Sequence, residues 1–128
     1  MTKKRSSSFV SRAQGAQWIK GLRSYFSYRD LGINKATDGK VLAQVIRAEQ
    51  QCDGPMGYHS HKLDFQMVYM LKGWAKVYLE DIGEIRVEAG DIWYQAPEVK
   101  HELLEYSDDW EVIEITLPAD FVTKSEKR

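Results

Sequence analysis

Cysteine is almost absent from the sequence, because Cys52 is the only one among 128 residues. A single thiol excludes an intrachain disulfide and a cysteine-based zinc cage, and it favours a reducing compartment. Long hydrophobic runs are absent as well. No apolar stretch approaches the roughly 18 residues that a membrane span needs, and no apolar region of a secretory signal is visible. We therefore expect a cytoplasmic protein that has no membrane partner.

Helical periodicity is also scarce. Residues Val10–Leu22 have the composition of one short helix, with Ser11 as its N-cap, but their apolar residues recur irregularly. From Ser24 onward, short runs of alternating apolar and polar residues are separated by turn residues, which is typical of an all-β sandwich or barrel. The expected strands are Tyr25–Leu31, Val41–Glu49, Tyr58–His61, Phe65–Leu71, Ala75–Glu80, Glu84–Val87, Asp91–Gln95, His101–Tyr106 and Glu111–Leu117.

The chain has the size and composition of one globular domain with two flanking segments. Its hydrophobic fraction of 43% and charged fraction of 29% are ordinary for a soluble protein. No internal repeat is present. We assign residues 1–23 to a basic N-terminal arm that carries aromatic residues, residues 24–118 to the barrel, and residues 119–128 to a polar C-terminal tail.

Acidic residues are missing from the first 29 positions, which carry seven basic residues. From Asp30 onward there are eleven basic and nineteen acidic residues, a balance of −8. The basic segment could bind a polyanion, act as a transit sequence, or pack against the acidic body of its own or a neighbouring subunit. Its aromatic content favours packing, and we expect no nucleic-acid partner. The aromatic residues are Phe9, Trp18, Tyr25, Phe26 and Tyr28.

The chain has three histidines, and their spacing suggests a metal site. His59 and His61 are two positions apart, so in a strand both side chains point to the same face. Gln66 follows close enough for a tight turn into the next strand, and His101 begins a later strand. Taken alone, a His-x-His pair is more often two exposed histidines than two ligands.

The surrounding residues resemble the two sequence motifs of the cupin family. His59, His61, Gln66 and Gly73 resemble the first motif, in which His-x-His precedes a carboxylate and then a glycine. The resemblance covers about residues 40–117, and all three histidines fall on ligand positions of the family. It implies a double-stranded β-helix, or jelly-roll, barrel.

The second motif is recognised by Gly90, then Pro97, and a closing histidine at His101. Two positions depart from the family pattern. Glu98 stands where a glycine usually follows the proline, and Glu105 stands where an asparagine is sometimes found. Both positions vary within the family, so the expected fold is unaffected.

The resemblance implies one divalent transition metal per chain, such as zinc, nickel, iron or manganese. Its expected ligands are His59, His61, Gln66 and His101. Gln66 replaces the usual glutamate, so the ligand shell is neutral and the ion keeps its full charge, which favours an anionic ligand. Alternatively, Gln66 forms only hydrogen bonds and the site has three histidines. Cupin polyketide cyclases with three histidines and a glutamine are the nearest functional resemblance, followed by three-histidine dioxygenases.

Strand alternation supplies further candidate residues for the interior. If His101 faces the lumen, Leu103 and Glu105 face it too, while Leu104 and Tyr106 face outward. In the last strand, alternation makes Glu114 a candidate lumen carboxylate, although a solvated or ion-paired glutamate is the commoner case. Tyr58 and Trp93 are candidates for the substrate pocket at the barrel mouth, although core packing is the more usual role of such residues.

Two classes of function agree with these features. The first is an enzyme that uses the metal as a Lewis acid on a small, oxygen-rich, anionic organic substrate, by cyclisation or oxygenation. The second is a cupin that binds or senses a small molecule without turnover. A metal that only staples strands is a weaker alternative. We also expect a homodimer, in which the basic arm crosses an acidic neighbouring subunit.

Overall fold

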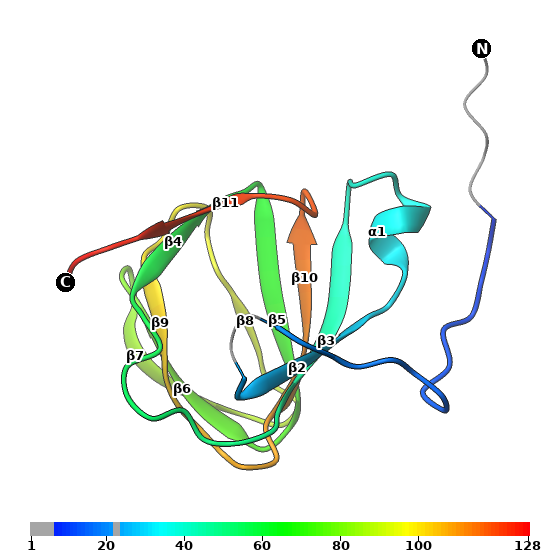
Figure 1. The fold of residues 1–128 in the computed structure, drawn as a ribbon. Helices are drawn as coiled ribbons and strands as arrows, with labels where there is room; N and C mark the ends of the chain where they lie inside the picture. Colours follow the sequence, from blue (N-terminus) through cyan, green and yellow to red (C-terminus); the bar gives the residue numbers. More distant parts are fainter. Residues whose placement is uncertain (1–6, 22–23) are drawn as a thin grey trace.

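A computed structural model describes residues 7–21 and 24–128, which form two antiparallel sheets packed face to face (Figure 1). The six-stranded sheet contains, in spatial order, β1 (Ile19–Lys20), β2 (Phe26–Asp30), β3 (Leu42–Ala48), β10 (Glu111–Leu117), β5 (Phe65–Lys72) and β8 (Ile92–Tyr94). The five-stranded sheet contains β11 (Val122–Ser125), β4 (His59–Lys62), β9 (His101–Tyr106), β6 (Trp74–Leu79) and β7 (Gly83–Glu88). The expected all-β jelly-roll architecture is confirmed.

All nine predicted strands are present, and their ends lie within one residue of the predicted ones. The helix expected over Val10–Leu22 is wrong for residues 10–21, which contain β1 instead, and Leu22 lies outside the described residues. The chain forms a short helix, α1 (Ile33–Ala36), which begins after Gly32 and ends at Thr37. No strand was expected after Pro118, yet β11 follows it. Among the described residues, no helix has the length and apolar character needed to cross a membrane.

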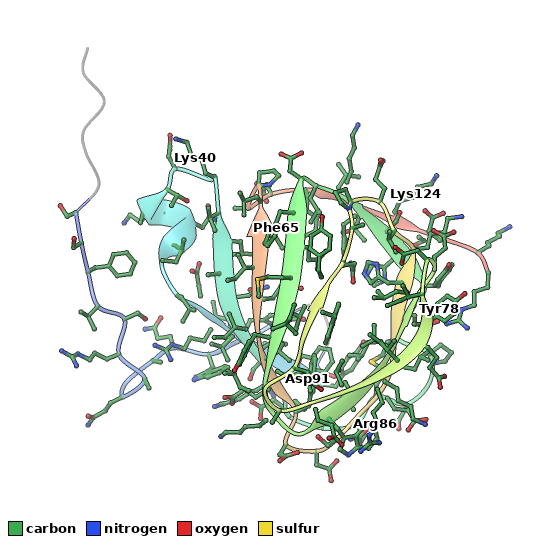
Figure 2. The ribbon with its side chains drawn as sticks, turned by 180° about the vertical axis from the view of Figure 1, so that it is seen from behind. Lys40, Phe65, Tyr78, Arg86, Asp91 and Lys124 are labelled. Atoms are coloured by element: carbon green, nitrogen blue, oxygen red, sulfur yellow. The ribbon has the colours of Figure 1, made fainter. Side chains whose placement is uncertain are left out.

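Side chains from both sheets fill the space between them (Figure 2). The most buried part contains a cluster of aromatic rings, in which Phe26 lies 5.2 Å from Tyr106 and 5.1 Å from Trp110, measured between ring centroids. The hydroxyl group of Tyr106 in this cluster has a hydrogen-bond partner. It donates to the carbonyl of Gln50 at 2.7 Å. Burial raises the pKa of Tyr106 to about 12, so this side chain stays neutral at any ordinary pH.

A bulge in β9 overturns the orientation expected for its second half. Leu103 and Glu105 pair with successive residues of β6, so Leu104 is an extra residue between them. Beyond the bulge, each side chain faces the side of the sheet opposite to the one that simple alternation predicts. Glu105 is exposed and lies 3.7 Å from the Lys76 ammonium group, whereas Tyr106 is only 3% exposed and belongs to the core. The expectation that Glu105 faces the lumen and Tyr106 faces outward is therefore wrong.

The described part of the N-terminal arm contacts the six-stranded sheet of its own chain. β1 pairs with β2, and the Arg47 guanidinium group lies 3.8 Å from the centre of the Trp18 ring. The Arg29 guanidinium group donates to the backbone carbonyl of Ser11 at 3.2 Å. Of the six basic residues of the arm, Arg12 and Lys20 lie within the described residues, and Lys3, Lys4, Arg5 and Arg23 lie outside them.

Three motif positions, Gly73, Gly90 and Glu98, have a left-handed backbone. Gly73 joins β5 to β6 with a φ of 75°, and a Cβ atom there would overlap the Ser107 hydroxyl oxygen and lie 2.7 Å from an Asp109 carboxylate oxygen. Glu98 has a φ of 64°, so it keeps the backbone conformation of the glycine that is usual at this position. Its backbone N–H donates to the carbonyl of His61 at 3.0 Å. The two motifs therefore supply turn geometry as well as candidate ligands.

We expect Gly73→Ala to lower the free energy of unfolding by about 2–4 kcal/mol, because the new side chain adds an overlap to the cost of a left-handed backbone. Gly90→Ala is the matched control, since Gly90 has a φ of 93° but open space around it. Its cost is about 1–2 kcal/mol. Denaturant titration of the two variants measures the difference, and equal losses would show that the contact with Ser107 is unimportant.

Candidate metal centre

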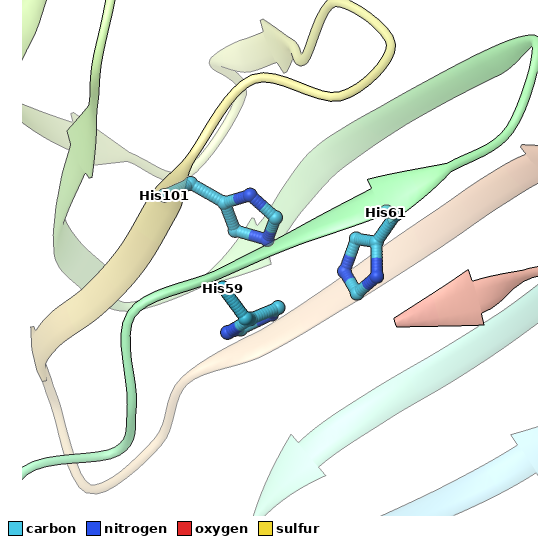
Figure 3. A group of neighbouring side chains, drawn as sticks. All are labelled: His59, His61 and His101. Carbon is cyan, nitrogen blue, oxygen red and sulfur yellow. The ribbon is translucent and has the colours of Figure 1, made fainter. Parts of the chain in front are cut away.

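Three imidazole rings from two neighbouring strands converge at one end of the barrel (Figure 3). His59 and His61 lie on β4, and His101 lies on β9 directly opposite His59. The ring centroids are separated by 4.2 Å for His59 and His101, and by 4.8 Å for each of the other two pairs. One nitrogen atom from each ring lies within 4.8 Å of the others, close to twice the zinc–nitrogen bond length of about 2.1 Å. These three side chains fit a single shared ion.

Hydrogen bonds on the far side of two rings determine which nitrogen carries the proton. His59 Nδ1 lies 3.0 Å from the carbonyl oxygen of Gly57, and His101 Nδ1 lies 3.0 Å from that of Val99. A carbonyl oxygen can only accept, so in each neutral ring Nδ1 carries the hydrogen and Nε2 carries the lone pair. Metal-binding histidines commonly have this arrangement, in which a backbone oxygen orients the ring.

The environment keeps His61 and His101 neutral. Burial lowers the pKa of His61 to about 3, and repulsion from a charged His101 or His59 acts in the same direction. Burial also lowers the pKa of His101 to about 4, although the hydrogen bond to the Val99 carbonyl opposes this shift. At neutral pH both rings therefore offer a lone pair without first losing a proton, which favours metal binding over protonation.

Gln66 lies beside this cluster, and its side chain is only 3% exposed. Its amide nitrogen donates to the Glu114 carboxylate at 3.1 Å, so its amide oxygen faces the other way. That oxygen accepts a hydrogen bond from the Gln95 amide nitrogen at 3.0 Å, and the same Gln95 nitrogen lies 3.1 Å from Nε2 of His101. Two candidate ligand atoms, the oxygen of Gln66 and Nε2 of His101, are thus directed toward one polar hydrogen-bond donor.

Sequence reasoning missed Gln95, which follows the last residue of β8. It is 4% exposed, and its amide nitrogen connects Gln66 with His101. The alternation of β8 carried the available signal, because Trp93 and Gln95 are two residues apart and both side chains line the same interior space.

Glu114 lies on β10 with its carboxyl group inside the barrel. One oxygen accepts a hydrogen bond from the Gln44 amide at 3.0 Å, and the other accepts from Gln66 at 3.1 Å. Burial raises the pKa of Glu114, while the two amide hydrogen bonds lower it and only partly compensate. The arrangement provides a carboxyl group that can hold a proton closer to neutral pH than an exposed glutamate can.

An interior cavity of about 370 Å³ connects the histidines, Gln66, Gln95 and Glu114. This volume is in the range of small-molecule sites. Trp93 lines the cavity, but Tyr58 does not. The Tyr58 ring lies outside the cavity, 6.0 Å from the Tyr78 ring, with the Arg128 guanidinium group 5.2 Å from its centre. Aromatic side chains also line the cavity, namely Phe26, Tyr28, Trp93, Trp110 and Phe121.

The segment expected to be a polar tail also contributes to the site. The Phe121 ring lies 4.9 Å from the His61 ring, and the Thr123 hydroxyl oxygen lies 2.9 Å from His61 Nδ1. Both residues line the cavity. The sequence signal was the short run Phe121-Val122-Thr123, whose residue types favour strands, but the charged residues that follow it obscured the pattern.

Comparison with known proteins gives similarity in fold. No protein-family model and no curated protein sequence matches the chain. KdgF from Halomonas sp. has a TM-score of 0.71 at 19% identity, over 88% of this chain and 94% of its own. The polyketide cyclase RemF from Streptomyces resistomycificus has a TM-score of 0.70 at 12% identity, over 100% of this chain and 87% of its own. An RmlC-like cupin from Shewanella frigidimarina has a TM-score of 0.62 at 16% identity, over 91% of this chain and 96% of its own. The chain therefore has the cupin fold, as the two sequence motifs predicted.

We expect the purified protein to bind about one divalent ion per chain, because three imidazoles converge in the cavity. Replacing His61 or His101 with alanine should remove stoichiometric metal, as measured by elemental analysis after equilibration with the ion and gel filtration. Tyr58→Phe is the control, since Tyr58 lies outside the cavity. Full metal occupancy in the double alanine variant would refute the site.

Proposed function

We propose that this chain is a metal-dependent enzyme acting on a small, oxygen-rich, anionic organic substrate. The observation that carries the proposal is the convergence of three imidazoles in a cavity that is also lined by aromatic side chains. The arrangement combines a site for a Lewis acid with a surface suited to a flat organic molecule.

In the proposed enzyme, His59, His61 and His101 hold the ion, and the amide oxygen of Gln66 is the fourth candidate ligand. A divalent ion bound there supplies Lewis-acid chemistry at a substrate oxygen. Because all four side chains are neutral, they leave the charge of the ion uncompensated, which favours a substrate with a carboxylate, enolate or phenolate group. Neutral nitrogen and oxygen ligands are compatible with zinc, nickel, iron and manganese.

Glu114 is the candidate proton-transfer group. Its carboxyl group lines the cavity, and burial raises its pKa, so it is better matched to proton transfer near neutral pH than an exposed carboxyl group is. Gln44 and Gln66 hold the carboxyl group in one orientation through their amide hydrogen bonds. We assign to Glu114 the acceptance of a proton from the bound substrate and its return to the product.

The aromatic side chains that line the cavity suggest the shape of the substrate. Flat rings stack on aromatic side chains, and a cavity of about 370 Å³ accommodates an aromatic or β-dicarbonyl compound of modest size. Cyclisation and oxygenation both act on such compounds. The similarity in fold to RemF, which is described as a polyketide cyclase, adds support for cyclisation.

A cupin that binds the same class of molecule without turnover is the alternative. The specific observation in its favour is that both oxygens of Glu114 already accept hydrogen bonds from amides, which reduces the basicity of the carboxylate. In that case the cavity would hold the metal and the ligand, and a change at the protein surface would signal that the ligand is bound.

The two functions are separated by incubating the metal-loaded protein with aromatic and β-dicarbonyl acids under air and following product formation by mass spectrometry. We expect turnover, and we expect Glu114→Gln to reduce it about 10²–10⁴-fold because the proton acceptor is lost. Metal content should be unchanged in this variant, which isolates proton transfer from metal binding. Tight binding of a ligand without product, in the parent protein, would favour the non-catalytic alternative.

We also propose that two chains associate through the outer face of the six-stranded sheet. Tyr69 on β5 is 40% exposed, and Ile92 and Tyr94 on β8 are each 52% exposed, which forms an apolar patch beside the open sheet edge. Tyr106, which the sequence placed on the outer face, is buried in the core and does not contribute to this surface. The described part of the basic arm lies at the opposite edge of the same sheet, where β1 pairs with β2.

Ile92→Lys should shift the protein toward the monomer, because a dimer would then bury a charged group. Ile82→Lys is the matched control, since Ile82 is 62% exposed in the turn between β6 and β7. Deleting residues 1–22 should weaken the dimer further if the arm takes part. Sedimentation at about 50 µM measures both effects, and a parent chain that remains monomeric there would refute the dimer.

A further inference from the structure

The C-terminal segment, residues 119–128, crosses the end of the barrel that contains the histidines. Its strand β11 is the edge strand of the five-stranded sheet and pairs with β4, so that Thr123 lies opposite His61 and Ser125 lies opposite His59. Figure 3 shows β11, in faint red, beside the His61 ring. The side chains of β11 are exposed, so burial of its own apolar surface does not account for its position.

Polar contacts beyond β11 hold the end of the segment in place. The Glu126 carboxylate accepts a hydrogen bond from the Ser60 hydroxyl at 2.7 Å, and its backbone N–H donates to the carbonyl of Tyr58 at 2.9 Å. The Arg128 guanidinium group donates to the Glu102 carboxylate at 3.2 Å and lies 4.3 Å from the centre of the Tyr78 ring. The segment is therefore anchored to β4, β6 and β9, two of which carry the three histidines.

The partner of His61 differs in kind from the partners of the other two rings. His59 and His101 donate from Nδ1 to carbonyl groups two residues before them in the chain. His61 Nδ1 instead lies 2.9 Å from the hydroxyl oxygen of Thr123, which is remote in sequence. A hydroxyl can donate or accept, so it allows either tautomer of His61. Only the tautomer in which Nδ1 donates to Thr123 leaves Nε2 available for an ion.

We propose that Thr123 is a positioning residue of the metal centre, and that docking of the C-terminal segment and metal binding favour each other. This inference rests on the proposed metal site. The Thr123 oxygen accepts the Nδ1 hydrogen of His61, and Phe121 packs against the same ring, so the segment holds the imidazole with Nε2 facing the cavity. Because coupling is reciprocal, a bound ion stabilises the docked segment by the factor that docking adds to metal affinity.

Cobalt(II) titration tests the role of the hydroxyl group, with absorption of the bound ion as the readout. Thr123→Val keeps the branched shape but removes the acceptor, and we expect the Kd for Co²⁺ to rise about 10-fold, the lower end of such effects because water can partly replace an exposed hydroxyl. Thr123→Ser should restore the Kd to within about 3-fold of the parent. Val122→Thr is the matched control and should leave the Kd unchanged, because Val122 is 66% exposed on the outer side of β11.

Hydrogen exchange of residues 119–128 provides a second measurement that does not depend on activity. In the parent protein, Co²⁺ should slow exchange in this segment, and in Thr123→Val the slowing should be lost or reduced. A chain ending at Pro118 should bind Co²⁺ more weakly than Thr123→Val, since it also lacks Phe121. If the point variant folds poorly, this truncation and Thr123→Ser still decide the question.

The outcomes separate this inference from the proposed function. A parent protein that binds no Co²⁺ would refute the metal centre itself, and the role of Thr123 would fall with it. A parent that binds Co²⁺, with an equal Kd in Thr123→Val, would refute only the positioning role. A weakened Thr123→Val that Thr123→Ser fails to restore would assign the effect to strand packing rather than to the hydroxyl, and would also overturn the inference.

Discussion

Inside the barrel, the amide nitrogen of Gln66 donates to the Glu114 carboxyl group at 3.1 Å, and the directions of the other polar contacts follow from this hydrogen bond. Because a carboxylate only accepts, the amide oxygen of Gln66 faces away from Glu114 and toward the amide nitrogen of Gln95. A glutamate at position 66 would bring two carboxyl groups to this distance, and they would have to share a proton. With a glutamine at position 66, Glu114 is the one acidic side chain among the described residues that line the cavity.

Much of the fold and the histidine cluster could be predicted because their signals are local. Alternation along each strand reflects the two faces of a sheet, and turn residues mark the ends, so nine strands were placed within one residue. The pairing of His59 with His61 is likewise a property of a single strand. Bringing His101 to them required the family resemblance, because spacing along the chain does not determine which strands are neighbours.

The features that were missed depend on contacts between distant segments. The bulge at Leu104 arises where β9 pairs with β6, and no residue in β9 itself marks it. β11 is a polar edge strand whose pairing with β4 determines its structure, so its composition resembles that of a tail. Tyr58 was expected in the pocket, but its contacts with Tyr78 and Arg128 lie outside the cavity.

The backbone hydrogen bond from Glu98 to the carbonyl of His61 joins the loop that precedes His101 to the strand that carries the other two histidines. It uses main-chain atoms only, and the left-handed backbone of Glu98 supplies its geometry at a cost of about 1 kcal/mol. The side chain of Glu98 therefore takes no part in this hydrogen bond. A substitution at this position that keeps the left-handed backbone therefore leaves this link between the histidine-bearing segments in place.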